Sequence, residues 1–193
     1  MSVLLLATTN PGKLREYREI FTELPFRLTT LDEQGIDLDV EETGATFAEN
    51  ALLKARAYAQ ASGLLTLADD SGLEIDALGG EPGVYSARWP TADTTYPERF
   101  KLIFERLADL SPERRTARFR CVIALARPDG WHEMVEGTVE GIIADAPRGA
   151  NGFGYDPIFY VPALGATTAE LSPEEKHRIS HRGRAALAAR DVL

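Results

Sequence analysis

Apolar residues recur along the chain with two different spacings, and each spacing predicts a different kind of element. The continuously apolar run from Val3 to Ala7 predicts a short buried strand. Apolar residues three and four positions apart then predict an amphipathic helix from Lys13 to about Phe21, and the same spacing returns from about Tyr96 to Leu107. The chain therefore combines buried strands with amphipathic helices.

Local capping signals place the starts of two further helices. Thr46-Phe47-Ala48-Glu49 forms a capping box, and the Ala-rich segment after it predicts a helix that stops at Gly63. Ser172-Pro173-Glu174-Glu175 supplies a cap, a proline at the first helical position and acidic residues beside the positive helix end. This second signal predicts the start of the last helix.

Four further segments predict strands. Residues 64–68 and 74–78 read as two short strands, with a Ser-Gly turn between them. Residues 118–126 and 134–144 read as a hairpin around Pro128-Asp129-Gly130. This order of elements predicts an α/β fold with a mixed sheet rather than a regular βαβ repeat. The length of 193 residues fits one domain over residues 1–193, or two small lobes that share a core.

Composition and charge narrow the classes of partner. A net charge of −9 and a pI of about 4.9 argue against a nucleic-acid partner, which requires a basic face. No segment approaches the roughly 18 apolar residues of a membrane span, and no basic region precedes the first apolar run, so we expect a cytoplasmic protein without a membrane partner. The single cysteine, Cys121, excludes an internal disulfide, and the alternating pattern around it indicates a core thiol.

The motif TTNPGK at 8–13 is a candidate anion site. A buried strand opens there into hydroxyl residues, a glycine and a lysine, and then enters a helix. Backbone N–H groups, the positive helix end and the charge of Lys13 favour an anion. The spacing is not that of the Walker motif, and the alternative is a Pro-Gly turn with a solvated lysine.

The motif ADDSG at 68–72 places two carboxylates at the predicted end of a strand. Successive strand residues point to opposite faces, so Asp69 and Asp70 cannot share one role unless the turn bends them together. A carboxylate in this position binds Mg²⁺ or takes a proton from water. The alternative is an aspartate that caps local amides in a turn.

A second acidic pair, Glu41-Glu42, precedes the Thr46 capping box. It is either a solvated loop or, together with Asp70, a source of the oxygen ligands that Mg²⁺ requires. On the following helix Asn50 and Lys54 lie four residues apart and share a face. Lys54 is either a surface charge or a second cation for a polyphosphate.

Two C-terminal motifs are candidates for binding a ring. Glycines flank Phe153 in NGFGYDP, and this flexible backbone lets the phenyl ring stand against a flat ligand. Asp156 can accept hydrogen bonds from the ring of that ligand. The alternative is a turn with core aromatics. Lys176, His181 and Arg182 lie on or near the last helix, where they either complement the helix dipole or donate to a carbonyl-bearing ring.

The combination of motifs is more specific than any one of them. TTNPGK, EETGATFAENALLKA, ADDSG, GFGYDPIF and SHRGRA follow one another in this order, and LGGEPGVYSARW at 78–89 fits the same pattern. The sequence resembles the Ham1/RdgB family of inosine-triphosphate pyrophosphatases, which clear non-canonical purine nucleotides. The resemblance runs from Leu4 to Ala185.

The resemblance implies an elongated mixed sheet flanked by helices, two lobes with a nucleotide cleft between them, a homodimer and dependence on Mg²⁺. It implies Asp70 as general base and metal ligand, with Glu41 as the other metal ligand, although one residue of loop register would exchange Glu41 for Glu42. The residues implied to bind the nucleotide are Thr8, Thr9, Asn10, Pro11, Gly12 and Lys13 for the triphosphate, Ser71, and for the base Phe153, Gly154, Tyr155, Asp156, Lys176, His181 and Arg182.

These inferences predict a hydrolase that cleaves ITP, dITP or XTP to the monophosphate and pyrophosphate. Two alternatives stay open at this point. One is a pyrophosphatase for modified pyrimidine nucleotides, which competition between purine and pyrimidine triphosphates would reveal. The other is a non-catalytic nucleotide sensor, for which Asp70 would be dispensable.

Overall fold

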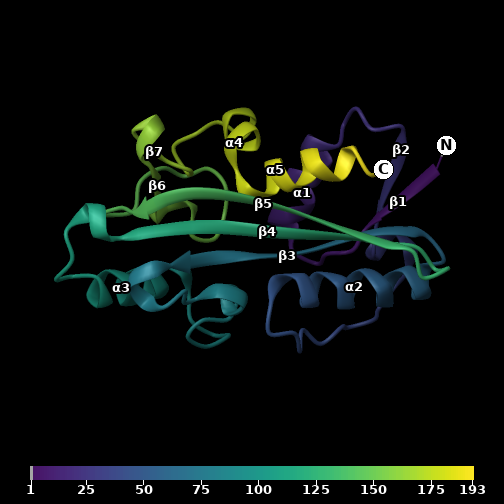
Figure 1. Cartoon of the computed structure of the whole chain (residues 1–193), viewed down its shortest axis with the longest axis horizontal. Helices are drawn as coiled ribbons and strands as arrows, with labels where there is room; N and C mark the ends of the chain where they lie inside the picture. The colour runs from purple at the N-terminus through teal and green to yellow at the C-terminus, as the bar shows by residue number, and fades with distance from the viewer. Residues whose placement is uncertain (1) are drawn as a thin grey trace. The chain divides into compact units, whose positions relative to one another are not determined.

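The computed structural model describes residues 2–193, and its strands form one mixed sheet (Figure 1). The strands are β1 (Ser2–Leu6), β2 (Phe26–Thr30), β3 (Leu65–Ile75), β4 (Thr116–Ala126), β5 (His132–Ile143), β6 (Phe159–Val161) and β7 (Ala166–Thr167). The helices are α1 (Pro11–Ile20), α2 (Phe47–Ser62), α3 (Tyr96–Arg106), α4 (Pro173–Ile179) and α5 (His181–Arg190). The strand order is β2-β1-β3-β4-β5-β6-β7.

The pairing directions confirm the α/β class with a mixed sheet. Strand β1 runs parallel to both β2 and β3. Strand β6 is antiparallel to both β5 and β7. The chain divides into two compact units, and β3, β4 and β5 contribute residues to both. Unit 1 contains the described residues up to Asp70 together with Cys121–Gly137 and Arg182–Leu193, and unit 2 contains Ser71–Arg120 and Thr138–His181.

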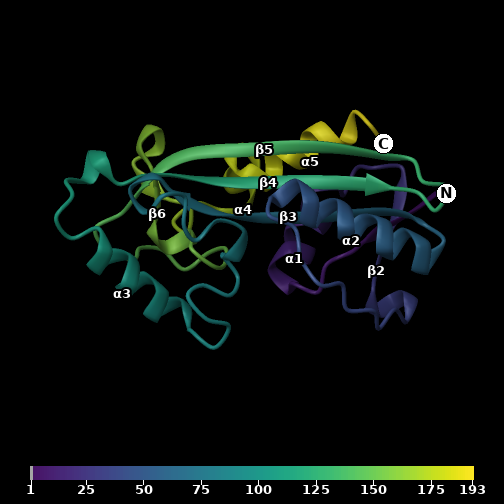
Figure 2. The same ribbon diagram turned by 60° about the horizontal axis from the view of Figure 1, so that its bottom comes forward.

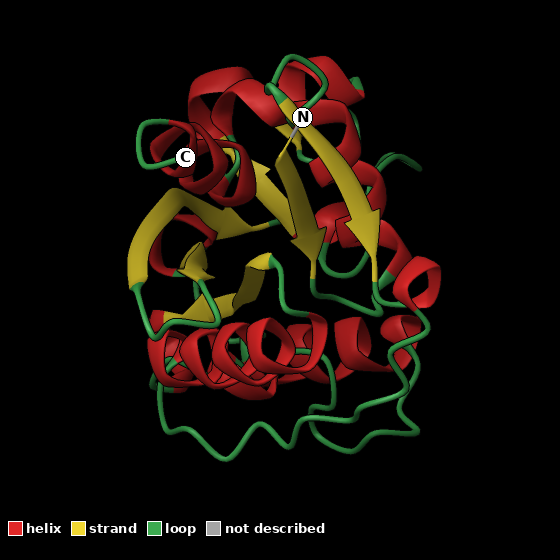
Figure 3. Ribbon diagram, turned by 90° about the vertical axis from the view of Figure 1, so that its right-hand side faces the viewer, coloured by secondary structure: helices red, strands yellow, loops and turns green. Residues whose placement is uncertain are grey.

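The core of unit 1 is built from alternate residues of its strands. Leu4, Leu6 and Leu67 are buried on one face, where Tyr17 of α1 and Ala185 of α5 pack against them. Figure 3 shows these strands in yellow between helices on both sides. Helices α1 and α5, which are far apart in the sequence, therefore share one hydrophobic cluster.

The core of unit 2 is centred on α3. Phe100 and Ile103 of this helix pack into a cluster with Leu73 of β3, Phe119 of β4 and Phe159 of β6. In Figures 1 and 2 the helix lies along one side of this part of the sheet. The apolar spacing from Tyr96 onward is thus confirmed as the buried face of a helix.

Local sequence signals predicted helix starts accurately. The capping boxes at Thr46 and Ser172 are both formed, and α2 ends at Gly63, which adopts a left-handed φ of 70°. The predicted single last helix is instead two helices. Ser180 has extended dihedral angles and separates α4 from α5.

The prediction of two strands on either side of a Ser-Gly turn is wrong. Strand β3 runs without interruption through the ADDSG motif, so Asp69 and Asp70 lie inside a strand and not at its end. Gly72 has no positive φ; a Cβ at this position would collide with the carbonyl oxygen of Gly83. Glycine here permits close approach of a neighbouring segment, and residues 76–78 form a short 3-10 helix instead of strand.

None of the described helices is both long enough and apolar enough to cross a membrane.

Candidate active site

The TTNPGK motif forms a helix start that is capped by its own asparagine. Asn10 Oδ1 accepts hydrogen bonds from the backbone N–H groups of Gly12 at 2.9 Å and Lys13 at 3.1 Å. Pro11 occupies the first helical turn, and the backbone N–H of Asn10 donates to Thr8 Oγ1 at 3.2 Å. Two N–H groups that were candidates for an anion therefore bind Asn10, which leaves the side chain of Lys13 as the main source of positive charge in this loop.

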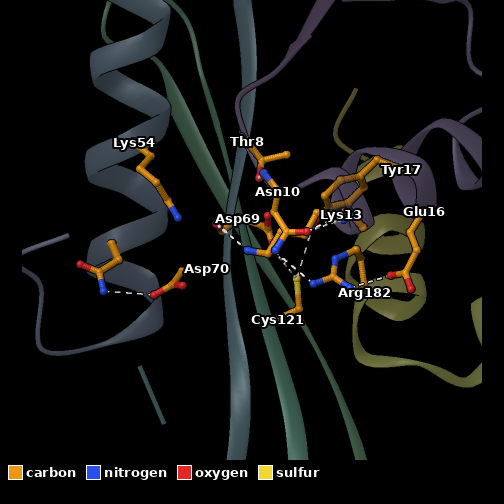
Figure 4. Close-up of polar contacts among 12 residues, drawn as sticks. Thr8, Asn10, Lys13, Glu16, Tyr17, Lys54, Asp69, Asp70, Cys121 and Arg182 are labelled. Atoms are coloured by element: carbon orange, nitrogen blue, oxygen red, sulfur yellow. Dashed lines mark hydrogen bonds and ion pairs between the residues drawn. The ribbon is translucent and has the colours of Figure 1, made fainter. Parts of the chain in front are cut away.

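Lys13 belongs to a buried network of charges in unit 1 (Figure 4). Its Nζ lies 2.9 Å from Asp69 Oδ2. Arg182 of α5 places Nη2 at 3.7 Å from the same oxygen and Nη1 at 2.6 Å from Glu16 Oε2 of α1. Two cations and two carboxylates thus alternate, and their charges cancel.

Asp70 points away from this network, as the alternation of strand side chains requires. It is 6% exposed, and its Oδ2 accepts a hydrogen bond from Asn50 Nδ2 of α2 at 3.1 Å. In Figure 4, Lys54 extends from the same helix toward the two aspartates. Its Nζ forms an ion pair of 2.5 Å with Glu42 Oε1. Lys54 is therefore a partly buried cation that is paired with Glu42, and not a solvated surface charge.

The two adjacent aspartates have opposite electrostatic character. Burial alone would raise the pKa of Asp69, but the cations of Lys13 and Arg182 hold it well below its usual range. Burial raises the pKa of Asp70 above its ordinary value, with Lys54 opposing that shift. For Lys54, burial lowers the pKa, but the carboxylates of Asp69, Asp70 and Glu42 together more than compensate, so that its pKa is raised.

The donor chemistry around Asp70 fits Mg²⁺. This ion prefers oxygen ligands, keeps several waters, and is usually held by one or two carboxylates together with substrate phosphates. Within residues 2–193, no three His, Cys, Asp or Glu side chains converge on one point, so the protein does not form a complete cage of its own. Glu41 is exposed, and its carboxylate makes no hydrogen bond or ion pair with the described residues, whereas that of Glu42 binds Lys54.

Cys121 is confirmed as a core thiol. It is fully buried, and its Sγ lies 3.7 Å from both Tyr17 OH and Asp69 Oδ2. Burial, reinforced by the nearby charge of Asp69, raises the pKa of the thiol to about 12. The thiolate that a nucleophile requires is therefore disfavoured.

In unit 2 the NGFGYDP segment is organised around the Asp156 carboxylate. Asp156 is 2% exposed, and its Oδ2 accepts from the backbone N–H of Phe153 at 2.8 Å and from Lys176 Nζ at 2.5 Å. Its Oδ1 accepts from Thr168 Oγ1 at 2.7 Å. Gly152, with a left-handed φ of 73°, lies so close that a Cβ would collide with Asp156 Oδ2. Asp156 therefore fixes the turn and holds Lys176, whose Nζ is 5.2 Å from the centre of the Phe153 ring.

Two other predicted base-binding residues have structural contacts. Tyr155 is buried, and its hydroxyl donates to the backbone oxygen of Ser86 at 2.9 Å. Arg99 of α3 donates to the same oxygen from Nη1 at 3.1 Å. His181 is 5% exposed, and its ring stacks on Phe119 at 4.7 Å between centroids. These contacts fix the segments that carry Tyr155 and His181.

The predicted residues thus fall into two groups. Thr8–Lys13, Asp70 and Arg182 belong to unit 1, and Ser71, residues 153–156, Lys176 and His181 belong to unit 2. Sequence reasoning missed the pairing of Arg182 with Glu16, because 166 positions separate the two residues. Their binding and catalytic roles stay predictions.

Comparison with known proteins identifies the family of the chain. The model of the Ham1 family matches residues 4–192. The chain belongs to the Ham1 family. It is 56% identical to a protein of Thermus thermophilus named dITP/XTP pyrophosphatase, over 94% of this chain and 87% of the relative.

Solved structures of Ham1 proteins share the fold. That of the Ham1 protein from Coxiella burnetii has a TM-score of 0.89 and 46% identity, with 100% of this chain and 98% of that chain covered. That of the Staphylococcus aureus Ham1 protein has a TM-score of 0.88 and 43% identity, with 99% and 97% covered. The Ham1 fold therefore extends over essentially the whole chain.

Proposed function

We propose that this Ham1 protein is a Mg²⁺-dependent nucleoside-triphosphate pyrophosphatase. It hydrolyses the non-canonical purine nucleotides ITP, dITP and XTP to the monophosphate and pyrophosphate and so cleanses the nucleotide pool. The observation that carries the proposal is the buried carboxylate of Asp70, with the partly buried ammonium groups of Lys54 and Lys13 near it, in a chain that is 56% identical to a named dITP/XTP pyrophosphatase.

The chemistry assigns a distinct role to each group in unit 1. Asp70 accepts the proton of the attacking water, whose oxygen forms a bond to the α-phosphorus. The bond between the α-phosphorus and the bridging oxygen breaks, and pyrophosphate leaves. Lys13 and Lys54 donate to phosphate oxygens and offset the charge of the leaving group. Mg²⁺ would be held by Asp70 and Glu41, where it supplies charge neutralisation and activation of water.

In unit 2 we assign recognition of the base. The Phe153 ring supplies a stacking surface, which has no preference among purines. We assign Lys176, whose Nζ lies 2.5 Å from Asp156 Oδ2, and His181 as donors to a ring carbonyl, and we propose Arg182 as a further donor. Buried donors that face the 6-amino group of adenine would stay unpaired, so the 6-carbonyl of hypoxanthine or xanthine is favoured.

Further parts of the proposal concern assembly and location. We propose a homodimer that acts in the cytoplasm on a small-molecule triphosphate, without nucleic-acid or membrane partners. The resemblance to the family supports the homodimer, and the net charge of −9 supports the exclusion of nucleic acid. Sedimentation of the purified protein at several concentrations tests the dimer.

One assay tests the activity. Pyrophosphate release is measured from ITP, dITP, XTP, GTP, ATP and a modified pyrimidine triphosphate, with Mg²⁺ and with a chelator in its place. We expect release from the first three, far less from ATP, and loss of release without the metal. Equal release from all six, or preference for the pyrimidine, would overturn the proposed substrate class.

A further inference from the structure

Strand β3 carries a second buried carboxylate, Asp69, to which the proposed chemistry gives no part. It is 1% exposed and adjoins Asp70, but it faces the opposite side of the strand. Asp70 contacts α2 through Asn50, whereas Asp69 contacts α1 through Lys13. The two aspartates therefore serve different neighbours.

The contacts of Asp69 define the position of the Lys13 ammonium group. Lys13 Nζ lies 2.9 Å from Asp69 Oδ2 and donates to the backbone oxygen of Asp69 at 3.5 Å. An ammonium group has three donors, so these two acceptors leave one donor for an anion. The Lys13 side chain is 13% exposed, which gives that donor access to solvent.

The remaining contacts explain why this carboxylate holds a lysine and not a metal. Arg182 Nη2 approaches the same Oδ2 at 3.7 Å, so a second cation already adjoins it. Arg182 is in turn anchored by Glu16 at 2.6 Å. A divalent cation at Asp69 would be repelled by both Lys13 and Arg182.

We propose that Asp69 is a positioning residue that holds the Lys13 ammonium in place for a phosphate of the substrate. The inference rests on the proposed function for the identity of the ligand. The loop supports this role: the backbone N–H groups of Gly12 and Lys13 donate to Asn10, so the lysine side chain is the positive charge that the loop can offer a phosphate. A lysine whose ammonium group is already held by Asp69 loses less conformational entropy when an anion binds.

The test uses inorganic tripolyphosphate as a probe, because it carries the phosphates and lacks the base. Its Kd is measured by calorimetry for the wild type, for Asp69→Asn, for Lys13→Met and for the double variant. We expect each single variant to weaken binding about tenfold, since each removes the ordered ammonium contact. We expect the double variant to bind as weakly as Lys13→Met alone, because Asp69 acts only through Lys13.

The same four proteins are assayed with ITP. Asp69→Asn should raise KM more than it lowers kcat. The loss of a proton acceptor would instead lower kcat. A double variant that binds tripolyphosphate more weakly than Lys13→Met would overturn the inference, as would a kcat loss of 100-fold or more in Asp69→Asn with KM unchanged. If Asp69→Asn alone does not fold, the comparison of Lys13→Met with the double variant still tests the inference. The double variant removes one positive and one negative charge together, so neither charge of the pair is left buried alone.

Glu33→Gln is the matched control for charge. Glu33 pairs with Arg18 of the same helix α1 at 3.0 Å and is half exposed, so the substitution changes net charge equally but leaves Lys13 untouched. It should bind tripolyphosphate as the wild type does. Binding of tripolyphosphate by a wild type that does not hydrolyse ITP would refute the proposed substrate while leaving the positioning role standing.

Discussion

The two units hold their buried charges in different ways. In unit 1 the Asp70 carboxylate accepts a hydrogen bond from the side-chain amide of Asn50. Lys54, a cation on the same helix as Asn50, forms its ion pair with Glu42. In unit 2 the Asp156 carboxylate is committed on both oxygens to groups that shape its own turn. The Asp70 carboxylate lies beside an amide and near cations that other groups also bind, whereas the donors around Asp156 fix the geometry of its turn.

Burial alone does not identify a reactive carboxylate. Asp69, Asp70 and Asp156 are all at most 6% exposed. For Asp70 burial prevails and raises the pKa, whereas the cations beside Asp69 lower the pKa of that carboxyl. The partners of each group, which arrive from other elements, set its role.

The largest effect should come from Asp70→Asn. An amide cannot take a proton from water and is a poorer Mg²⁺ ligand, so kcat should fall by about 10²–10⁴-fold, with the loss of metal adding to this. The measurement is pyrophosphate release from ITP by protein whose thermal unfolding matches the wild type. Asp76→Asn, which removes an exposed carboxylate paired with Arg118, should keep full activity. Wild-type turnover in folded Asp70→Asn would remove Asp70 from the mechanism.

The next effect concerns stability in unit 2. Asp156→Ala leaves the Lys176 ammonium, whose side chain is 4% exposed, without its carboxylate, which should cost about 3–5 kcal/mol of unfolding free energy. Urea denaturation measures this. Asp145→Ala breaks an ion pair in which the aspartate is 74% exposed and should cost at most about 1 kcal/mol. Equal losses in the two variants would contradict the role assigned to Asp156.

Base recognition gives an intermediate effect. Phe153→Ala should lower kcat/KM for ITP and ATP alike, because stacking of a base on an aromatic ring is worth about 1–3 kcal/mol whatever the purine. Arg182→Ala should reduce the preference for ITP over ATP. Arg182→Lys keeps a charge beside Glu16 and controls for loss of the buried pair. An unchanged ratio of ITP to ATP in Arg182→Ala would show that Arg182 does not read the base.

The smallest effect is expected for Tyr155→Phe. The variant loses one hydrogen bond of 2.9 Å to the Ser86 carbonyl oxygen, to which Arg99 still donates. We expect a loss of about 0.5–1.5 kcal/mol in unfolding free energy, measured by denaturation, with kcat unchanged. A drop in kcat comparable to that of Asp70→Asn would mean that Tyr155 contacts substrate directly.

Local signals account for what the sequence could predict of the fold. Capping at Thr46 and Ser172 depends on residues within one helical turn, and both boxes are formed. The strands β2, β6 and β7 were not predicted; the last two have only three and two residues, too few for a period to be recognised. The break at Ser180 was also not predicted, because neither glycine nor proline stands there to end α4; serine is, however, a residue that commonly precedes the first turn of a helix, as it does before α5.

Tertiary contacts account for what could not be predicted. The ADDSG motif reads as a turn because buried aspartates are costly in a strand unless they are paired. Lys13 and Asn50, which provide that pairing, stand far from the motif in the sequence. The motifs could be found in the sequence, and their order indicated the family. The different partners of Asp69 and Asp70 could not be predicted, because they depend on where α1 and α2 lie.

The products formed from ITP show directly whether the protein uses Asp70 to cleave between the α- and β-phosphates. Phosphorus NMR follows ITP with Mg²⁺ and either wild-type protein or folded Asp70→Asn. The account predicts that the wild type forms inosine monophosphate and pyrophosphate in equal amounts, and that the variant forms both far more slowly. Formation of inosine diphosphate and free phosphate, or equal rates in the two proteins, would contradict it.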